Sequence, residues 1–403
     1  LAGTRLWTMD NETAERELSR ALTELTRASA ASRSRLHYAR ATSRYTVGEL
    51  NASRADIDAG DALRVPGADA DLDDTAAALQ SHFAWASAEP ARSLEYARRA
   101  GAAFAARGDL WRQAEIIWTI PWNLFFLGRL DGSMAALAEF EAIAERIGHQ
   151  GARWVVVHAR ATHQAARGEI EAALRTAREA ETIGRAAGIP WVYHTQSFIG
   201  TMSIWQGRDD EGLAILRKTA AYEPVRNYWY PSARSHLFEI LTLLAPDEAR
   251  EWHARDPLAL EIEGTLAPCG VWTAVGGLTE AYARLGYRNE VLALAPHVDE
   301  LRRRGGILHG GWMSTTATVV AITLWHRDRW DEAEAEFRRA IEQVDTIPVF
   351  HKRGQPREWY AEMLVARDAP GDRDRARALF AEAREIYAAL GFEGLRRRVR
   401  TID

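Results

Sequence analysis

The stretch "SIWQGRDDEGLAIL", Ser203 to Leu216, sets three consecutive acidic residues between two glycines. Acidic side chains in a glycine-containing loop can bind a cation such as calcium. They are also common where one helix ends and the next begins. Glycine accepts the left-handed conformation of a helix C-terminus, and acidic residues are favoured at a helix N-terminus. The rest of the chain decides between these interpretations, because the pattern recurs.

The pattern returns at intervals of 37 to 43 residues. The segments "LGRLDGSMAAL", "ARGEIEAALRT" and "RLGYRNEVLAL" each show an apolar stretch, a glycine, an acidic or amide residue three positions later, and a new apolar stretch. The clear units are anchored at Gly128, Gly168, Gly207 and Gly286, and less regular units at Leu244, Asp328, Gly371 and near Ala86. The three acidic residues are therefore predicted to be a turn and a helix start, because a calcium loop needs alternating oxygen ligands and a distal glutamate.

The repeated unit predicts an all-α protein, a superhelical solenoid of about eight antiparallel helix pairs. In the second helix of one unit, Met134, Leu137, Phe140, Ile143 and Ile147 recur at a spacing of about 3.6 residues. Strand-like alternation of useful length is absent from the sequence. Each pair packs mainly on its neighbours, so a length of 403 residues does not require several separate cores.

The predicted organisation has four parts. These are an N-terminal helical segment (1–64), a loop (65–74), the helical repeats (75–390) and a C-terminal cap (391–403). The N-terminal segment is expected to contain helices over 11–30 and 34–62, the second long and interrupted at Gly48.

Composition narrows the classes of function. The net charge of -5 argues against a dedicated nucleic-acid binder. A single cysteine, Cys269, excludes an intramolecular disulfide and cysteine-based zinc sites, and favours the cytoplasm. No apolar run approaches the roughly 18 residues that span a bilayer, so no membrane association is expected.

Catalytic and cofactor motifs are missing. The chain has only two lysines, Lys218 and Lys352, and neither lies in a phosphate-binding loop. His158 and His163 are five positions apart, which misses the ligand spacing of one helix face. We therefore expect a non-catalytic protein with no cofactor and no metal.

Two resemblances follow from these residues. The turn chemistry "G-R-x-D-E-A-L" resembles the tetratricopeptide repeat, although the units here exceed the roughly 34-residue standard. The stretch from Arg353 to Phe392, "RGQPREWYAEMLVARDAPGDRDRARALFAEAREIYAALGF", is similar to the last repeats of bacterial signalling ATPases. These include maltose-activator-type regulators and multidomain adenylate/guanylate cyclases. The resemblance implies a sensor or interaction arm, with ATPase or cyclase domains elsewhere in the full-length protein.

In tetratricopeptide-like stacks the first helix of each pair lines the concave surface. The resemblance therefore implies a groove that many of the 15 tryptophans would line. Tryptophan and arginine dominate binding hot spots, although any one tryptophan could instead pack between layers. The candidate groove residues are Trp118, Trp122, Phe126, Trp154, His158, His194, Trp205, Arg234, Phe238, Glu280 and Trp325.

The function predicted from these features is a binding arm for a peptide, a partner segment or a small effector. One alternative is an α/α-toroid enzyme, with a tryptophan-lined pocket and catalytic carboxylates on inner helices, for which Glu115, Glu280 and Glu358 are the candidates. Another is a peptide-pheromone receptor, in which residues 1–64 would form a small N-terminal bundle.

Overall fold

The structure is a computed structural model that describes residues 11–189, 191–221, 227–229, 231–258, 260, 262, 264, 266–308 and 315–402. Over these ranges the regular elements are helices, apart from an isolated bridge between Leu308 and Thr315. The helices are α2 (Asn11–Glu24), α3 (Ala30–Thr46), α4 (Leu50–Leu63), α5 (Ala70–Ala86), α6 (Pro90–Ala106), α7 (Leu110–Ile117), α8 (Thr119–Phe126), α9 (Leu130–Ile147), α10 (Gln150–Ala166), α11 (Ile170–Ala186), α12 (Val192–Trp205), α13 (Asp209–Ala221), α14 (Ser232–Leu244), α15 (Pro246–Arg255), α16 (Cys269–Leu285), α17 (Arg288–Arg303), α18 (Thr316–His326), α19 (Trp330–Thr346), the 3-10 helix η1 (Phe350–Lys352), α20 (Gly354–Arg367), α21 (Asp372–Ala389) and α22 (Glu393–Arg396).

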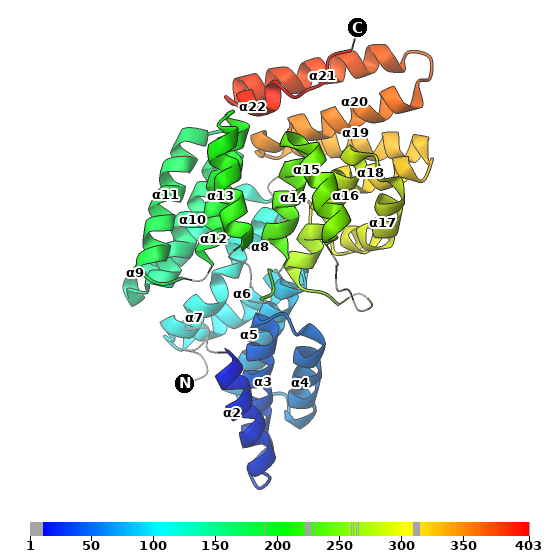
Figure 1. The fold of residues 1–403 in the computed structure, drawn as a ribbon. Helices are drawn as coiled ribbons and strands as arrows, with labels where there is room; N and C mark the ends of the chain where they lie inside the picture. The colour runs from blue at the N-terminus through cyan, green and yellow to red at the C-terminus, as the bar shows by residue number, and fades with distance from the viewer. Residues whose placement is uncertain are drawn as a thin grey trace.

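Consecutive helices pack as neighbouring pairs (Figure 1), which confirms the predicted all-α solenoid. The described residues contain nine pairs: α3/α4, α5/α6, α7–α8/α9, α10/α11, α12/α13, α14/α15, α16/α17, α18/α19 and α20/α21. In the third pair the first helix is interrupted between α7 and α8. None of the described helices is both long and apolar enough to cross a bilayer.

The N-terminal part differs from the prediction in detail. The expected long helix over 34–62 is two helices, α3 and α4, which pack against each other around Gly48. The expected loop over 65–74 is shorter, because α5 begins at Ala70, capped by the Asp69 side chain. Gly48 has a left-handed φ of +88°, so it ends a helix as the later turn glycines do.

The turns inside the first five pairs follow one rule. Their left-handed residues are Gly48, Ala88, Gly128, Gly168 and Gly207, spaced by 39 or 40 positions. Ala88 adopts this conformation without being glycine, with φ of 58°. The acidic triplet that follows Gly207 forms the first turn of α13, as the helix-start interpretation predicts. Among the described residues no group of acidic, histidine or cysteine side chains is arranged to hold a metal ion.

Successive turns of the superhelix touch each other. Arg304, at the end of the seventh pair, donates to the backbone of Ser87 in the second pair, 217 positions earlier. Arg398, which follows the ninth pair, donates to Asp209 in the fifth pair at 2.5 Å. Ile307 N donates to Phe126 O at 2.8 Å. A pair therefore lies against the chain about five pairs further on, and Figure 1 shows α22 beside the α12 and α13 region.

The turn glycines make this stacking close. A methyl group added to Gly168 would lie 2.8 Å from Cδ2 of Leu390, and one on Gly128 would lie 3.3 Å from Cδ1 of Ile307. By contrast Gly108, Gly148 and Gly188, which join one pair to the next, would meet no atom within 4 Å. Gly128 and Gly168 thus serve both the turn and the contact with the next superhelical turn.

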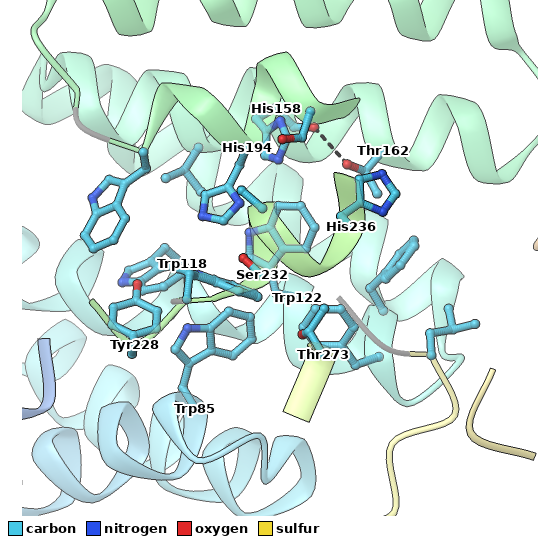
Figure 2. A pocket seen from close by; sticks show the side chains of 18 of the residues that line it. Trp85, Trp118, Trp122, His158, Thr162, His194, Tyr228, Ser232, His236 and Thr273 are labelled. Carbon is cyan, nitrogen blue, oxygen red and sulfur yellow. Dashed lines mark hydrogen bonds between the residues drawn. The ribbon is translucent and has the colours of Figure 1, made fainter. Parts of the chain in front are cut away.

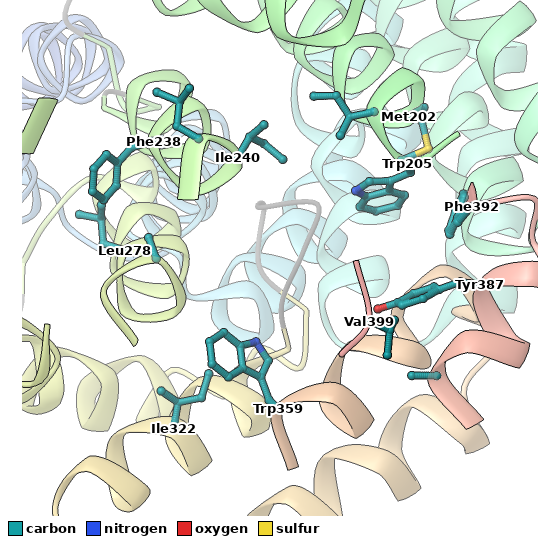
Figure 3. Close-up of a cluster of buried hydrophobic side chains, with 14 of the residues drawn as sticks. Met202, Trp205, Phe238, Ile240, Leu278, Ile322, Trp359, Tyr387, Phe392 and Val399 are labelled. Atoms are coloured by element: carbon teal, nitrogen blue, oxygen red, sulfur yellow. The ribbon is translucent and has the colours of Figure 1, made fainter. Parts of the chain in front are cut away.

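The largest hydrophobic core runs through the C-terminal half of the solenoid (Figure 3). It joins first helices to the C-terminal residues that cover them: Met202 and Trp205 of α12 lie near Phe392 and Val399. Trp205 and Phe392 have ring centroids 4.9 Å apart, and both side chains are almost fully buried. The C-terminal segment therefore contributes buried side chains to the hydrophobic core, in addition to forming the polar end of the solenoid.

Candidate functional site: an aromatic cavity

The inner ends of several first helices surround one cavity, which we call the aromatic cavity (Figure 2). The volume of this cavity that water can reach is about 150 Å³. Its lining comes from α5, α8, α10, α12, α14, α16, η1 and the segments before α8, α12, α14 and α18. The lining residues are Trp85, Trp118, Trp122, Phe125, Phe126, Trp154, Val155, His158, Thr162, Trp191, His194, Ser197, Tyr228, Trp229, Ser232, Ala233, His236, Thr273, Leu308, His351 and Lys352.

The break between α7 and α8 places two of the tryptophans. Pro121 has no N–H, and its ring conflicts with the carbonyl of the residue four positions earlier, Ile117. The helix stops at Ile117 and restarts at Thr119, whose hydroxyl donates to Ile116 O at 2.8 Å. Trp118 lies at this break, and Trp122 follows one turn later; both reach the cavity.

The aromatic walls are held by ring contacts both between helices and within one helix, α10. Trp85 meets Trp118 edge-on at 5.4 Å and stacks on Phe126 at 5.6 Å between ring centroids. Trp154 stacks on His158 at 5.4 Å with an interplanar angle of 1°. Such pairs are each worth about 0.5–1.5 kcal/mol beyond the area they bury. The walls are therefore pre-formed rather than loose side chains.

Two of the cavity histidines, His158 and His194, are uncharged near neutral pH. Burial lowers the pKa of His158 to about 4 and that of His194 to about 3. Nδ1 of His158 lies 3.2 Å from the hydroxyl of Thr195, which also accepts from Nε1 of Trp154 at 3.2 Å. Nε2 of His194 is buried and has no hydrogen-bond partner within the described part of the chain. His194 therefore offers one polar contact to a ligand in a mainly apolar cavity.

Six of the predicted groove residues meet in this cavity. They are Trp118, Trp122, Phe126, Trp154, His158 and His194. That these residues bind a ligand remains a prediction. Because their side chains line one cavity, the prediction now concerns this cavity.

The other five predicted residues lie elsewhere. Trp205 and Phe238 are packed in the main core, each 2% exposed, because the next superhelical turn or a neighbouring helix covers their inner faces. Arg234 pairs with Asp256 and lies over the Trp252 ring. Glu280 is buried and accepts hydrogen bonds from Gln355 at 2.6 Å and from Nε1 of Trp359 at 2.9 Å. Trp325 lies at a separate hollow.

That second hollow lies between α12, α16, α18 and α20 and has a volume of about 450 Å³. Trp205, Arg284, Trp325, Glu358 and Trp359 are among its lining residues. Burial raises the pKa of Glu358 to about 7. The lining of this second hollow combines charged and aromatic side chains, whereas the lining of the aromatic cavity is mainly aromatic.

Of the three carboxylates that the toroid alternative proposes, Glu280 and Glu358 lie near enough to interact, since the Glu280 carboxylate contributes, after burial, to the raised pKa of Glu358. Glu115 lines a hollow near Tyr38 and His82, where burial raises the pKa of its carboxyl to about 7. Glu358 lines the second hollow, and Glu280 lines neither of these hollows. No two of these three carboxylates therefore line the same hollow, as a pair acting on one substrate would, and Oε2 of Glu280 accepts hydrogen bonds from Gln355 and Trp359.

Sequence reasoning missed many of the lining residues, among them Trp85, Trp191, Tyr228, Trp229 and Lys352. Trp85 stands three positions before the turn residue Ala88, as Phe125 stands before Gly128, so recognising Ala88 as a turn residue would have identified it. Tyr228 and Trp229 belong to the aromatic run "NYWYP" between helices. No signal in the sequence points to Lys352.

The fold and the cavity define an all-α helical-repeat protein, a superhelical solenoid with a hollow of aromatic side chains inside it. No protein-family model and no curated protein sequence matches the chain. Among solved structures, the crystal structure of the yeast Tom70 is similar over 98% of this chain and 87% of that chain, with 13% sequence identity and a TM-score of 0.38. A likeness of this degree bears on neither the partner nor the activity of this chain.

Proposed function

We propose that this chain is a non-catalytic binding arm whose aromatic cavity receives an apolar group of a ligand. The observation that carries the proposal is the convergence of aromatic side chains from α5, α8, α10 and the 227–229 segment on one hollow. Aromatic side chains supply a large contact area at low conformational entropy, which is why they dominate binding hot spots.

The size of the cavity limits what enters it. A volume of about 150 Å³ is comparable to that of engineered cavities that bind benzene. The occupant is therefore a small effector, or one side chain of a peptide or partner segment. A folded partner could contact only the rim.

The charge of the lining favours a neutral occupant. Among the described lining residues there is no carboxylate, and the buried His158 and His194 are uncharged near neutral pH. A cation would lack a counter-charge among them and would meet Lys352 in the same hollow. An aromatic or aliphatic group satisfies the walls without this penalty.

A role in signalling is the finer part of the proposal. It is supported by the resemblance of residues 353–392 to the last repeats of bacterial signalling ATPases. Occupation of the cavity would then be communicated to an ATPase or cyclase domain of the full-length protein or to a partner protein. The single cysteine supports a cytoplasmic setting for this arm.

The toroid alternative has less support from the arrangement of the pairs. The N-terminal helices α2–α4 and the C-terminal helices α20–α22 lie at opposite ends of the molecule (Figure 1), whereas a toroid brings its first and last pairs together.

The experiment compares two capped amino acids that differ in one phenyl group. N-acetyl-phenylalaninamide and N-acetyl-alaninamide are titrated into the protein, and tryptophan fluorescence and the melting temperature are recorded. We expect saturable binding of the phenyl compound alone, with a raised melting temperature. If both compounds leave fluorescence and melting unchanged, or if they act equally, the proposal is wrong.

A further inference from the structure

One lysine is among the residues that line the aromatic cavity. Lys352 ends the 3-10 helix η1, between α19 and α20, and η1 packs against α10. The residue is 3% exposed and belongs to the cavity lining. The other lysine of the chain, Lys218, is exposed on α13. The buried lysine thus stands where a bound ligand would lie.

The charge state of this amine suits a nucleophile. Burial lowers the pKa of Lys352 to about 7, and the nearby carboxylates of Glu239 and Glu280 only partly oppose that shift. Near neutral pH a large share of the amine is therefore uncharged and carries its lone pair. A lysine that is desolvated in a largely apolar site is the usual way in which proteins obtain an amine that attacks carbonyl carbon.

The same cavity supplies groups that can move protons. His236 lines it, with Nε2 2.7 Å from the hydroxyl of Thr201 and Nδ1 3.4 Å from Oε2 of Glu239. The Glu239 side chain is 2% exposed, so its carboxylate is kept largely out of solvent. Imine formation moves two protons from nitrogen to the departing oxygen, and His236 is placed in the cavity to relay them.

We propose that Lys352 holds a small aromatic aldehyde in the aromatic cavity as an imine. The lone pair of Nζ attacks the carbonyl carbon, and the C=O π electrons move to oxygen to form a carbinolamine. The nitrogen loses its two protons and the oxygen leaves as water, so that C=N replaces C=O. The step consumes no oxidant and no reductant, and water reverses it. This inference rests on the proposed function, because the aromatic walls must first take up the ring.

The test uses the intact protein with benzaldehyde and sodium cyanoborohydride at neutral pH. The reductant converts an imine into a stable benzyl amine, and peptide mass spectrometry locates the label. We expect label on Lys352 in at least about tenfold excess over Lys218, since an ordinary lysine amine with a pKa near 10.4 is roughly a thousandfold less deprotonated at pH 7. Equal or greater labelling of Lys218 refutes the imine.

Matched variants exclude indirect effects. Lys352→Arg keeps a cation but removes the nucleophile, and should abolish cavity labelling. Lys218→Arg should leave labelling of Lys352 unchanged. If Lys352→Arg does not fold, the ratio of label between the two lysines of the unmodified protein still decides.

A second titration separates the two proposals. Benzyl alcohol carries the same ring but no carbonyl group, so it tests the cavity alone. Benzyl alcohol that binds while Lys352 stays unlabelled refutes the imine and supports the binding function. If benzyl alcohol does not bind and Lys352 is not labelled, both proposals fail. Label on Lys352 that benzyl alcohol suppresses by competition supports both.

Discussion

Replacing Trp122 with alanine should weaken ligand binding more than it weakens folding. The Trp122 ring lies 5.6 Å from the His158 ring and 6.3 Å from the rings of Phe125 and Phe126, and one side of it faces the aromatic cavity. Removing it takes away a wall of the site. If the cavity is the recognition site, we expect a loss of about 2 kcal/mol, or roughly thirtyfold in Kd, as for a hot-spot residue.

The stability cost is bounded by comparison with a core residue. Trp122 already borders a hollow, so its truncation enlarges an existing space, and we expect a cost of about 1–2 kcal/mol, below the usual range for a buried aromatic residue. Ile143 on α9 is 5% exposed and packs in the same N-terminal half of the core. Ile143→Ala should cost about 2–5 kcal/mol, because it opens a new cavity.

The assay is a paired measurement on both variants. N-acetyl-phenylalaninamide is titrated by fluorescence, and unfolding is followed in urea. If Trp122→Ala unfolds as easily as Ile143→Ala and binds the probe as tightly as the unmodified protein, the ring is packing and the cavity is not a site.

Three further predictions test other parts of the fold. Gly168→Ala should lower the free energy of unfolding by about 2–3 kcal/mol, because the new methyl group crowds Leu390 in addition to straining the backbone. Gly188→Ala, at a position with open space around it, should lower it by only about 1 kcal/mol. Equal melting temperatures of the two variants would refute the stacking role of Gly168. Stability should fall as pH is lowered from 6.5 toward 4, because the unfolded chain takes up a proton that buried His158, with its pKa lowered to about 4, does not. In urea melts, the stability of His158→Gln should fall less over this pH range than that of the unmodified protein. The stability of Glu358→Gln should fall more steeply. The raised pKa of the Glu358 carboxyl stabilises the folded state at low pH, and this contribution is lost as pH rises toward about 7. Phe392→Ala should cost about 3–5 kcal/mol and shift tryptophan emission to the red, because this fully buried ring covers Trp205; a change below about 1 kcal/mol would show that the C-terminal segment is dispensable.

The fold was accessible from the sequence because its signal is local. Gly128, Gly168 and Gly207 with the acidic residues after them mark helix ends whatever surrounds them. The prediction differs from the structure at two turns, Ala88, which breaks the glycine rule, and Gly48, which follows it. Ala88 takes a left-handed conformation without being glycine, and Gly48 was interpreted as an interruption rather than as a turn between two helices.

The site was accessible only in part, because its lining depends on the pitch of the superhelix. Trp122, six positions before Gly128, and Trp205, two positions before Gly207, are both predicted to face the groove, yet one borders the aromatic cavity and the other lies against Phe392. The difference is set by residues about five pairs further along the chain. Lys352 sits on an irregular segment after Ile347-Pro348, where no periodicity applies.

The contact between superhelical turns also limits how this array can change in length. In a simple repeat protein each unit meets only its neighbours, so one unit can be gained or lost with local consequences. Here Gly168 meets Leu390 and Asp209 meets Arg398, so deleting a single pair between them would bring each turn glycine against a different segment. The fold therefore requires a fixed number of pairs between such partners. Only a whole superhelical turn could be duplicated without losing the contacts between successive turns. Contacts over such long separations should also make folding slower and more cooperative than in an array with neighbour contacts alone.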